Sequence, residues 1–301
     1  MTFQDVEKAR EVYHKERQKY LAITLAATIL TALFFGLALG PFSIAPALFI
    51  LCAMAVFSAF ATRTSATNYR KAYKGYFIEQ NLQKIFTDLS YRHDAGINKS
   101  LIASTGMINT GDIFSSNDLV TAKYKDVSLI QADAHIQTES TDSDGNTTYV
   151  TIFKGRFMIF EFPKKFNFRL ELIGRKFHPY RVPGKDTTTG RKLSKLSTES
   201  TEFNHSFKIF GDDGFETYYI LDPALMVKIN DIAEHYNHKI LLGFINNKMM
   251  VALNDGTDSF EPPRPSRPIN EATELAKVYA DIKVITDFVD KLSLDHKLFT
   301  K

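Results

Sequence analysis

The sequence predicts an α+β protein: an N-terminal two-helix transmembrane hairpin, followed by a cytoplasmic mixed antiparallel-sheet domain with a C-terminal helix. Three observations predict this class. No charged residue lies between Tyr20 and Thr62, short alternating apolar segments follow Gly96, and a helical period returns near the end of the chain. Of the 301 residues, 44% are hydrophobic and 24% are charged, which excludes a fibrous or disordered chain.

Residues 1–20 are expected to form a cytoplasmic N-terminal helix, and residues 21–61 the transmembrane hairpin. Two apolar runs, 21–39 and 42–61, each reach the roughly 20 residues that a helix needs to cross a bilayer. Gly40-Pro41 separates them and suits the end of one helix and the start of the next. A cleaved signal peptide is the alternative. Four acidic residues precede the first run, which disfavours cleavage: Asp5, Glu7, Glu11 and Glu16.

Basic residues flank both apolar runs, whereas the connecting loop has none. The positive-inside rule therefore predicts a multi-pass membrane protein with both termini in the cytoplasm. No Asp, Glu, Lys, Arg or His lies within either run, so the hairpin is expected to be an anchor and not a transport path. The single cysteine, Cys52, cannot form an internal disulfide and is expected to pack as a small apolar residue. The flanking bases are Lys8, Arg10, Lys15, Arg17 and Lys19 before the hairpin, and Arg63, Arg70, Lys71 and Lys74 after it.

Residues 62–95 are predicted to be a juxtamembrane helix, because apolar residues recur there at spacings of three and four. Residues 96–260 are the α+β domain. Asp144-Gly145-Asn146 is expected to turn a hairpin, Asp222-Pro223 to start a helix, and residues 239–253 to form a second hairpin turning at Asn246-Asn247. The predicted strands are 119–124, 127–137, 148–153, 157–162, 168–173 and 203–210.

Residues 261–269 contain four prolines and are predicted to be a stiff, extended linker. Residues 270–294 then form a final helix, with Asn270 as its cap and apolar residues at spacings of three and four. This heptad-like seam is shorter than three heptads. Docking against the domain or the juxtamembrane helix is therefore favoured over self-association, although a homo-oligomer stays open.

The sequence shows no catalytic constellation, and we predict no cofactor and no metal site. The phosphate-binding, dinucleotide-binding and nucleophile-elbow motifs are missing. His235 and His238 are spaced three apart and lack the HExxH pattern of a zinc site. The alternative to a binding module is an enzyme acting on a membrane-associated substrate. Its candidate acid–base or metal groups are Asp212, Asp213, His235 and His238.

Charge is divided unevenly along the soluble part. Residues 154–195 hold 12 Lys and Arg against 3 Asp and Glu, a net excess of +9. Such a stretch can bind acidic lipid headgroups or an acidic membrane-protein partner, whereas tethering to the membrane disfavours nucleic acid. The alternative is that the interleaved aromatic residues form core and the bases only face water. The predicted binding residues are Lys164, Lys165, Arg175, Lys176, Arg191 and Lys192.

Spaced aromatic motifs resemble a known bacterial family. They are Phe153-Lys154-Gly155 with Phe157, Phe203-Asn204 with Phe207, Tyr219 through Leu221-Asp222-Pro223, and Phe260-Glu261. Over roughly residues 69–292 and the hairpin ahead of them, the chain resembles the membrane proteins of domain of unknown function 3137.

This resemblance implies a bacterial inner-membrane protein with a cytoplasmic domain, sometimes encoded near LemA-like membrane proteins. It supplies no established activity or site residues. We therefore expect a membrane-anchored cytoplasmic binding or scaffold module, with acidic lipid or a membrane protein, such as a LemA-like one, as its partner.

Overall fold

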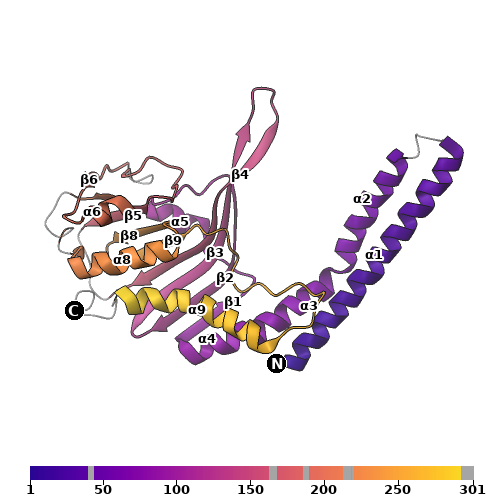
Figure 1. The fold of residues 1–301 in the computed structure, drawn as a ribbon, viewed down its shortest axis with the longest axis horizontal. Coiled ribbons are helices and arrows are strands. Elements are labelled where there is room, and N and C mark those ends of the chain that lie inside the picture. Colours follow the sequence, from indigo (N-terminus) through magenta and orange to yellow (C-terminus); the bar gives the residue numbers. More distant parts are fainter. Residues whose placement is uncertain (40–43, 163–167, 186–189, 213–217, 219, 293–301) are drawn as a thin grey trace. The chain divides into compact units, whose positions relative to one another are not determined.

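The computed structural model describes residues 1–39, 44–162, 168–185, 190–212, 218 and 220–292 (Figure 1). The chain divides into two compact units. The first unit comprises residues 1–81 and 261–278, and the second comprises residues 82–260 and 279–301. The C-terminal helix α9 (Glu271–Leu292) contributes residues to both units.

The first unit is helical. The predicted N-terminal helix and the first apolar run form one continuous helix, α1 (Phe3–Leu39), and the second run forms α2 (Ile44–Ala61). These helices are in contact, with the rings of Tyr20 and Phe57 centred 6.0 Å apart. By length and apolarity, α1 can span a membrane over Phe3–Phe35. The shorter α2 qualifies only together with the helices that follow it, to which it is bent by 44°. An N-terminal apolar helix is thus confirmed. The expected Gly40-Pro41 turn lies outside the described residues.

The juxtamembrane helix is shorter than the sequence predicts. It consists of α3 (Arg63–Tyr73), a π-helical segment η2 (Lys74–Glu79) and α4 (Gln80–Ile85). Residues 87–92 then form the strand β1 instead of further helix. Asp88, with a positive φ of 49°, lies at the irregularity where β1 begins to pair with β2. Strand pairing at the sheet edge therefore overrides the local helical period.

The second unit contains the predicted antiparallel sheet, which has nine strands in the order β1-β2-β3-β4-β9-β8-β5-β7-β6 among the described residues. Short helices α5 (Lys99–Thr105) and α6 (Thr201–Ser206) and the longer α8 (Pro223–His235) accompany it. The strands are β1 (Thr87–Arg92), β2 (Ile113–Tyr124), β3 (Val127–Thr141), β4 (Thr147–Glu161), β5 (Arg169–Gly174), β6 (Ser194–Leu196), β7 (Phe207–Gly211), β8 (Ile240–Ile245) and β9 (Lys248–Leu253).

Three features of this unit differ from the sequence prediction. The predicted strands 148–153 and 157–162 are one long strand, β4, which runs through Gly155. The predicted strand 203–210 is divided into α6 and β7, because the hydroxyl of Ser200 accepts a hydrogen bond from the Phe203 amide and caps a short helix. The short elements β6 and α5 were not predicted.

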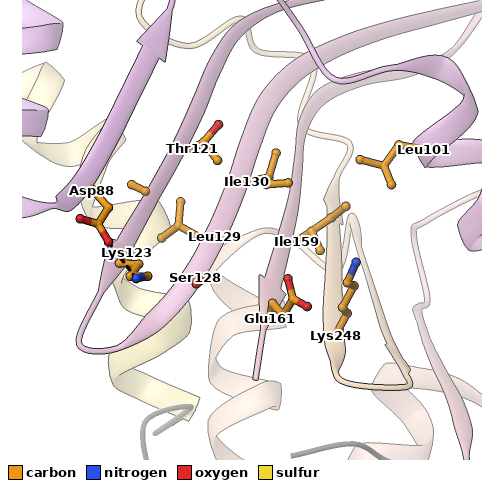
Figure 2. A pocket seen from close by; sticks show the side chains of 11 residues that line it. Asp88, Leu101, Thr121, Lys123, Ser128, Leu129, Ile130, Ile159, Glu161 and Lys248 are labelled. Carbon is orange, nitrogen blue, oxygen red and sulfur yellow. Dashed lines mark ion pairs between the residues drawn. The ribbon is translucent and has the colours of Figure 1, made fainter. Parts of the chain in front are cut away.

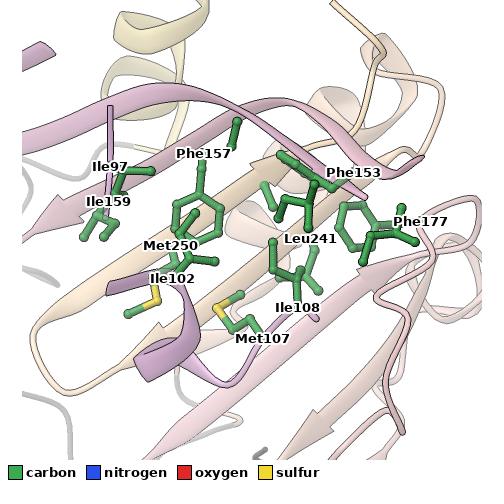
Figure 3. Close-up of a cluster of buried hydrophobic side chains, with 14 of the residues drawn as sticks. Ile97, Ile102, Met107, Ile108, Phe153, Phe157, Ile159, Phe177, Leu241 and Met250 are labelled. Carbon is green, nitrogen blue, oxygen red and sulfur yellow. The ribbon is translucent and has the colours of Figure 1, made fainter. Parts of the chain in front are cut away.

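Each face of the sheet has its own core. On one face, side chains of β3, β4 and β9 pack against Ile102 of α5 and against Met107 and Phe177 (Figure 3). On the other face, the Phe288 ring of α9 lies 6.0 Å from Phe160 and 6.4 Å from Tyr236. Alternation along each strand supplies both cores.

Several predicted local signals are confirmed. Asp222 accepts a hydrogen bond from the Leu225 amide at 2.7 Å, with Pro223 at the start of α8. Asn270 likewise accepts from the Thr273 amide at 3.0 Å. Gly145 adopts a φ of +82° at the β3–β4 turn, which extends beyond the sheet as a two-stranded arm (Figure 1). The β8–β9 hairpin turns at Asn246, which has a positive φ of 56°.

Gly155 is a position where only glycine fits. Its φ is +149°, and a Cβ there would lie 2.1 Å from the Leu253 carbonyl oxygen of β9. We expect Gly155→Ala to lower the free energy of unfolding by about 3 kcal/mol or more, because the backbone strain of an alanine at this φ adds to the steric overlap of its Cβ with Leu253. Thermal unfolding of the detergent-solubilised full chain measures this change.

The matched control is Gly145→Ala, because Gly145 also has a positive φ but has open space around its Cβ position. It should lower stability by only about 1–2 kcal/mol. Equal effects of the two substitutions would contradict the assigned close approach of β4 and β9.

Candidate anion-binding surface

Basic side chains gather around β7 and the edge strand β6 in the second unit. All of them are exposed, and they come from the turn after β5, from the segment before β6, and from β6 and β7 themselves. We call this group the basic edge. Its members are Arg175, Lys176, Lys185, Arg191, Lys192, Lys195 and Lys208.

Backbone pairing places these bases along the strand β7. The Arg175 amide donates to the Ser206 carbonyl at 2.9 Å, immediately before β7 begins. Lys208 of β7 lies opposite Ile173, and Lys195 of β6 lies opposite Phe210. Lys185 and Lys192 form an isolated antiparallel bridge. Backbone pairing therefore fixes where these residues lie along the edge of the sheet.

A buried ionic cluster fixes the chain beneath the basic edge. The fully buried Glu171 carboxylate contacts Arg169 at 2.8 Å and Arg181 at 2.7 Å. The guanidinium groups also donate to backbone carbonyls at and just after the end of α5, Arg169 to Thr105 and Arg181 to Met107. These contacts tie the segment after β5 to the sheet. Two cations against one anion leave a net positive charge, which adds to the potential of the basic edge.

Of the six residues predicted to bind an acidic ligand, the four that the structure describes do not converge on one point. Lys164 and Lys165 lie outside the described residues. The other four are exposed, although Lys176 donates to the Asn237 side chain at 2.6 Å and Arg191 contacts Asp212 at 2.7 Å. Arg175 bonds to Ser206 before β7, and Asp212 follows β7 six residues later, which is about 20 Å at 3.3 Å per residue. The bases form a stripe and not a closed pocket.

The acid–base residues of the enzyme alternative are also separated. Asp212 exchanges hydrogen bonds with Arg169 at the start of β5. The carbonyl of His238 accepts from the Lys176 amide just past the end of that strand. The intervening strand spans about 16 Å. His235 is exposed at the end of α8, and Asp213 lies outside the described residues. Asp212 and His238 therefore do not form an acid–base pair.

His238 is the unusual residue beside the basic edge. It is buried, with a positive φ of 55°, and its Nδ1 atom has no hydrogen-bond partner within the described part of the chain. Burial lowers the pKa of its imidazole, and the positive charge of Arg175 lowers it further. His238 is thus a neutral group beneath a cationic surface at neutral pH.

A shallow hollow of about 310 Å³ lies on the sheet face that carries α5 (Figure 2). Ile130 and Ile159, directly opposite each other on β3 and β4, are among the apolar residues that line it. A polar row crosses four strands beside them in direct register: Lys123, Ser128, Glu161 and Lys248. Lys123 is paired with Asp88 at 2.8 Å. Because both charge signs line this hollow, it suits an anion less well than the basic edge does.

A second buried ionic network joins α9 to the sheet. The Asp133 carboxylate accepts from the Ser259 amide at 2.7 Å and from its hydroxyl at 3.0 Å. Arg156 donates to the Ser259 hydroxyl and contacts Asp281 of α9 at 2.5 Å. Burial raises the pKa of Asp133 to about 7, against the opposing influence of Arg156.

The sequence could not distinguish buried bases from exposed ones. Arg156, Arg169 and Arg181 all contribute to the +9 excess of residues 154–195, yet each is paired inside the protein. The one available signal is that Arg169 and Glu171 are two residues apart, and so share one face of a strand.

The fold and its surfaces define a class: an α+β protein with an antiparallel sheet and an N-terminal helix able to span a membrane. Residues 151–294 match the family model described as "Protein of unknown function (DUF3137)". The resemblance seen in the sequence is thereby confirmed over these residues.

The other comparisons add little. No curated protein matches the chain. A solved structure, "crystal structure of the mycobacterial trehalose monomycolate transport factor A, TtfA", is similar at 10% identity with a TM-score of 0.39. The match covers 74% of this chain and 95% of that one.

Stability should depend on pH through Asp133. Its folded pKa is raised, so protonation favours the folded state, and the free energy of unfolding should fall as pH rises from about 4 to 7. The contribution is at most about 1.4 kcal/mol per pH unit. Thermal unfolding of the full chain and of Asp133→Asn across this range measures the difference. An unchanged slope in the variant would contradict the assignment.

Proposed function

We propose that this protein is a membrane-anchored cytoplasmic binding or scaffold module that contacts acidic lipid headgroups or an acidic membrane-protein partner. The observation that carries the anchor is the apolar exterior of α1 and α2. Their outward side chains are largely uncovered, with Phe34 67%, Phe49 73% and Phe60 72% exposed. An apolar surface of this kind needs hydrocarbon around it.

The proposed anchor is a two-span hairpin. The contact between α1 and α2 and the lack of charge between Tyr20 and Thr62 support it. Bases on the flanks of both spans favour a cytoplasmic location for both termini, and the family resemblance favours a bacterial inner membrane.

Topology is tested by fusing alkaline phosphatase after Lys301 in a Gram-negative host. Because the enzyme matures only outside the cytoplasm, the fusion should be inactive. The same enzyme inserted between Gly40 and Pro41 should be active, since that loop faces the other side. Activity of the C-terminal fusion would contradict the proposed orientation.

The proposed binding surface is the basic edge. A base near an anionic leaflet gains about 1 kcal/mol, and several bases on one stripe act together. Exposed side chains held by strand register can meet a flat acidic surface without rearrangement. The family resemblance adds a LemA-like membrane protein as a proposed partner. The apolar seam of the C-terminal helix adds self-association to the proposal.

Binding of acidic lipid is tested by energy transfer in nanodiscs that hold the full chain. A donor dye on Ser197→Cys, beside β6 in a Cys52→Ser background, reports proximity to acceptor-labelled headgroups. Transfer should be greater with phosphatidylglycerol than with phosphatidylcholine alone, and should fall at about 0.5 M salt because exposed charges are screened. The fourfold Gln variant of Arg175, Lys176, Arg191 and Lys192 should match the phosphatidylcholine level.

The matched control replaces four bases elsewhere in the second unit with Gln: Lys84, Lys123, Lys125 and Lys283. It should leave transfer unchanged. Equal energy transfer in the two lipid compositions would contradict lipid binding. The proposed ligand of the basic edge would then be an acidic membrane-protein partner.

A further inference from the structure

The proline-rich segment 261–270 is not a free linker. Within the first unit it lies against α1 and α3, and the hydrogen bonds of Pro263, Pro265 and Ile269 hold it there. Tyr69 of α3 donates to the Pro263 carbonyl at 3.0 Å, and Arg10 of α1 donates to the Pro265 carbonyl at 2.8 Å. The Ile269 amide donates to Glu7 at 2.7 Å. The expected extended linker is thus a docked loop.

Buried groups make this docking firm. Arg10, Pro265 and Ile269 are buried, and Lys74 of η2 is only 1% exposed where it contacts Glu261 at 2.8 Å. Prolines restrict the backbone further. The backbone of the loop is therefore fixed relative to α1 and α3.

Two arginines of this loop take no part in its docking. Arg264 and Arg267 are exposed and have neither an ion pair nor a hydrogen bond within the described residues. By contrast, Arg10 is paired with Glu7 at 2.9 Å, and Arg70 lies 3.4 Å from Glu261. The nearby acids thus neutralise the helix bases and leave the loop arginines free.

Both free arginines line a hollow of about 620 Å³ formed by the loop and the first turn of α9. Ser266 adds an exposed hydroxyl to its wall. Glu274 also lines the hollow, and its carboxylate accepts a hydrogen bond from Tyr73 at 2.8 Å. Asn270 caps α9 itself, so the helix end offers less to a ligand than the two guanidinium groups do.

The hollow lies close to the proposed membrane surface. Tyr13 of α1, whose ring is 6.2 Å from Tyr69, precedes the apolar run by eight residues, or about 12 Å of helix. The headgroup layer extends roughly 5–8 Å beyond the hydrocarbon. The gap between Pro263 and the headgroups is therefore within the reach of the Arg264 side chain, which lies at the end of the hollow nearest the proposed membrane.

We propose that Arg264 and Arg267 bind the phosphate of an anionic glycerophospholipid headgroup. A guanidinium group can donate two parallel hydrogen bonds to phosphate oxygens, and both arginines line the same hollow. This inference rests on the proposed membrane anchor, but it does not involve the basic edge of the second unit.

Native mass spectrometry of the detergent-solubilised full chain tests the site, with phosphatidylglycerol and phosphatidylethanolamine added in equal amounts. Wild type should retain phosphatidylglycerol preferentially. Arg264→Gln/Arg267→Gln should bind it about tenfold more weakly, as expected when charged hydrogen bonds are lost. The control Arg63→Gln/Lys71→Gln removes the same charge from exposed sites of α3 and should change binding less than twofold.

Two results would overturn the proposal: equal loss in both variants, or no preference between the lipids. Inorganic phosphate and glycerol phosphate, added at millimolar concentration, distinguish the source of the ligand. If the lipid stays bound, the result supports a lipid headgroup as the ligand. If the soluble phosphates displace the lipid, the natural ligand is a soluble phosphate and the proposal is wrong. An active C-terminal phosphatase fusion would remove the anchor itself, so the two failures are distinguishable.

Discussion

The close approach of β4 to β9 is the constraint on which the second unit depends. It joins strands that are almost one hundred residues apart in sequence, and it connects the β1–β4 half of the sheet to the half that carries β8, β5, β7 and β6. Gly155 permits this approach because any Cβ would meet the Leu253 carbonyl. Without this junction the basic edge would have no rigid support, since β7 and β6 reach the rest of the sheet only through β5 and β8.

The sequence predicted helix caps and turns correctly where the interactions that form them lie within a few residues of one another. Asp222, Asn246 and Asn270 act through hydrogen bonds or backbone conformations within a few residues, and the structure contains each of the expected caps or turns. Periodicity was less reliable near Leu89, where pairing with a distant strand decides the outcome. The segment 203–210 shows the same limit, because the cap at Ser200 competes with strand propensity.

The candidate sites depend on tertiary contacts that no pattern in the sequence reveals. The net charge of residues 154–195 correctly marks a basic region, but it counts Arg169 and Arg181, which Glu171 holds inside the protein. For the loop arginines the sequence misleads in the opposite direction. A proline-rich segment predicts a spacer, so the arginines in it are not expected to belong to a site. Docking of that segment requires Arg10 and Tyr69, which lie roughly 200 to 250 residues earlier in the chain. Pairing decides which bases remain available to a ligand.

The β3–β4 arm has a practical consequence for studying the protein in cells. Residues 139–151 are exposed throughout, and nothing lies within 4 Å of the Cβ position at Gly145. Because the strands of the arm pair only with each other beyond Gln137, a lengthened turn there leaves the register of the main sheet unchanged. A small fluorescent reporter inserted at this tip would follow the protein in living cells while both chain ends stay unmodified.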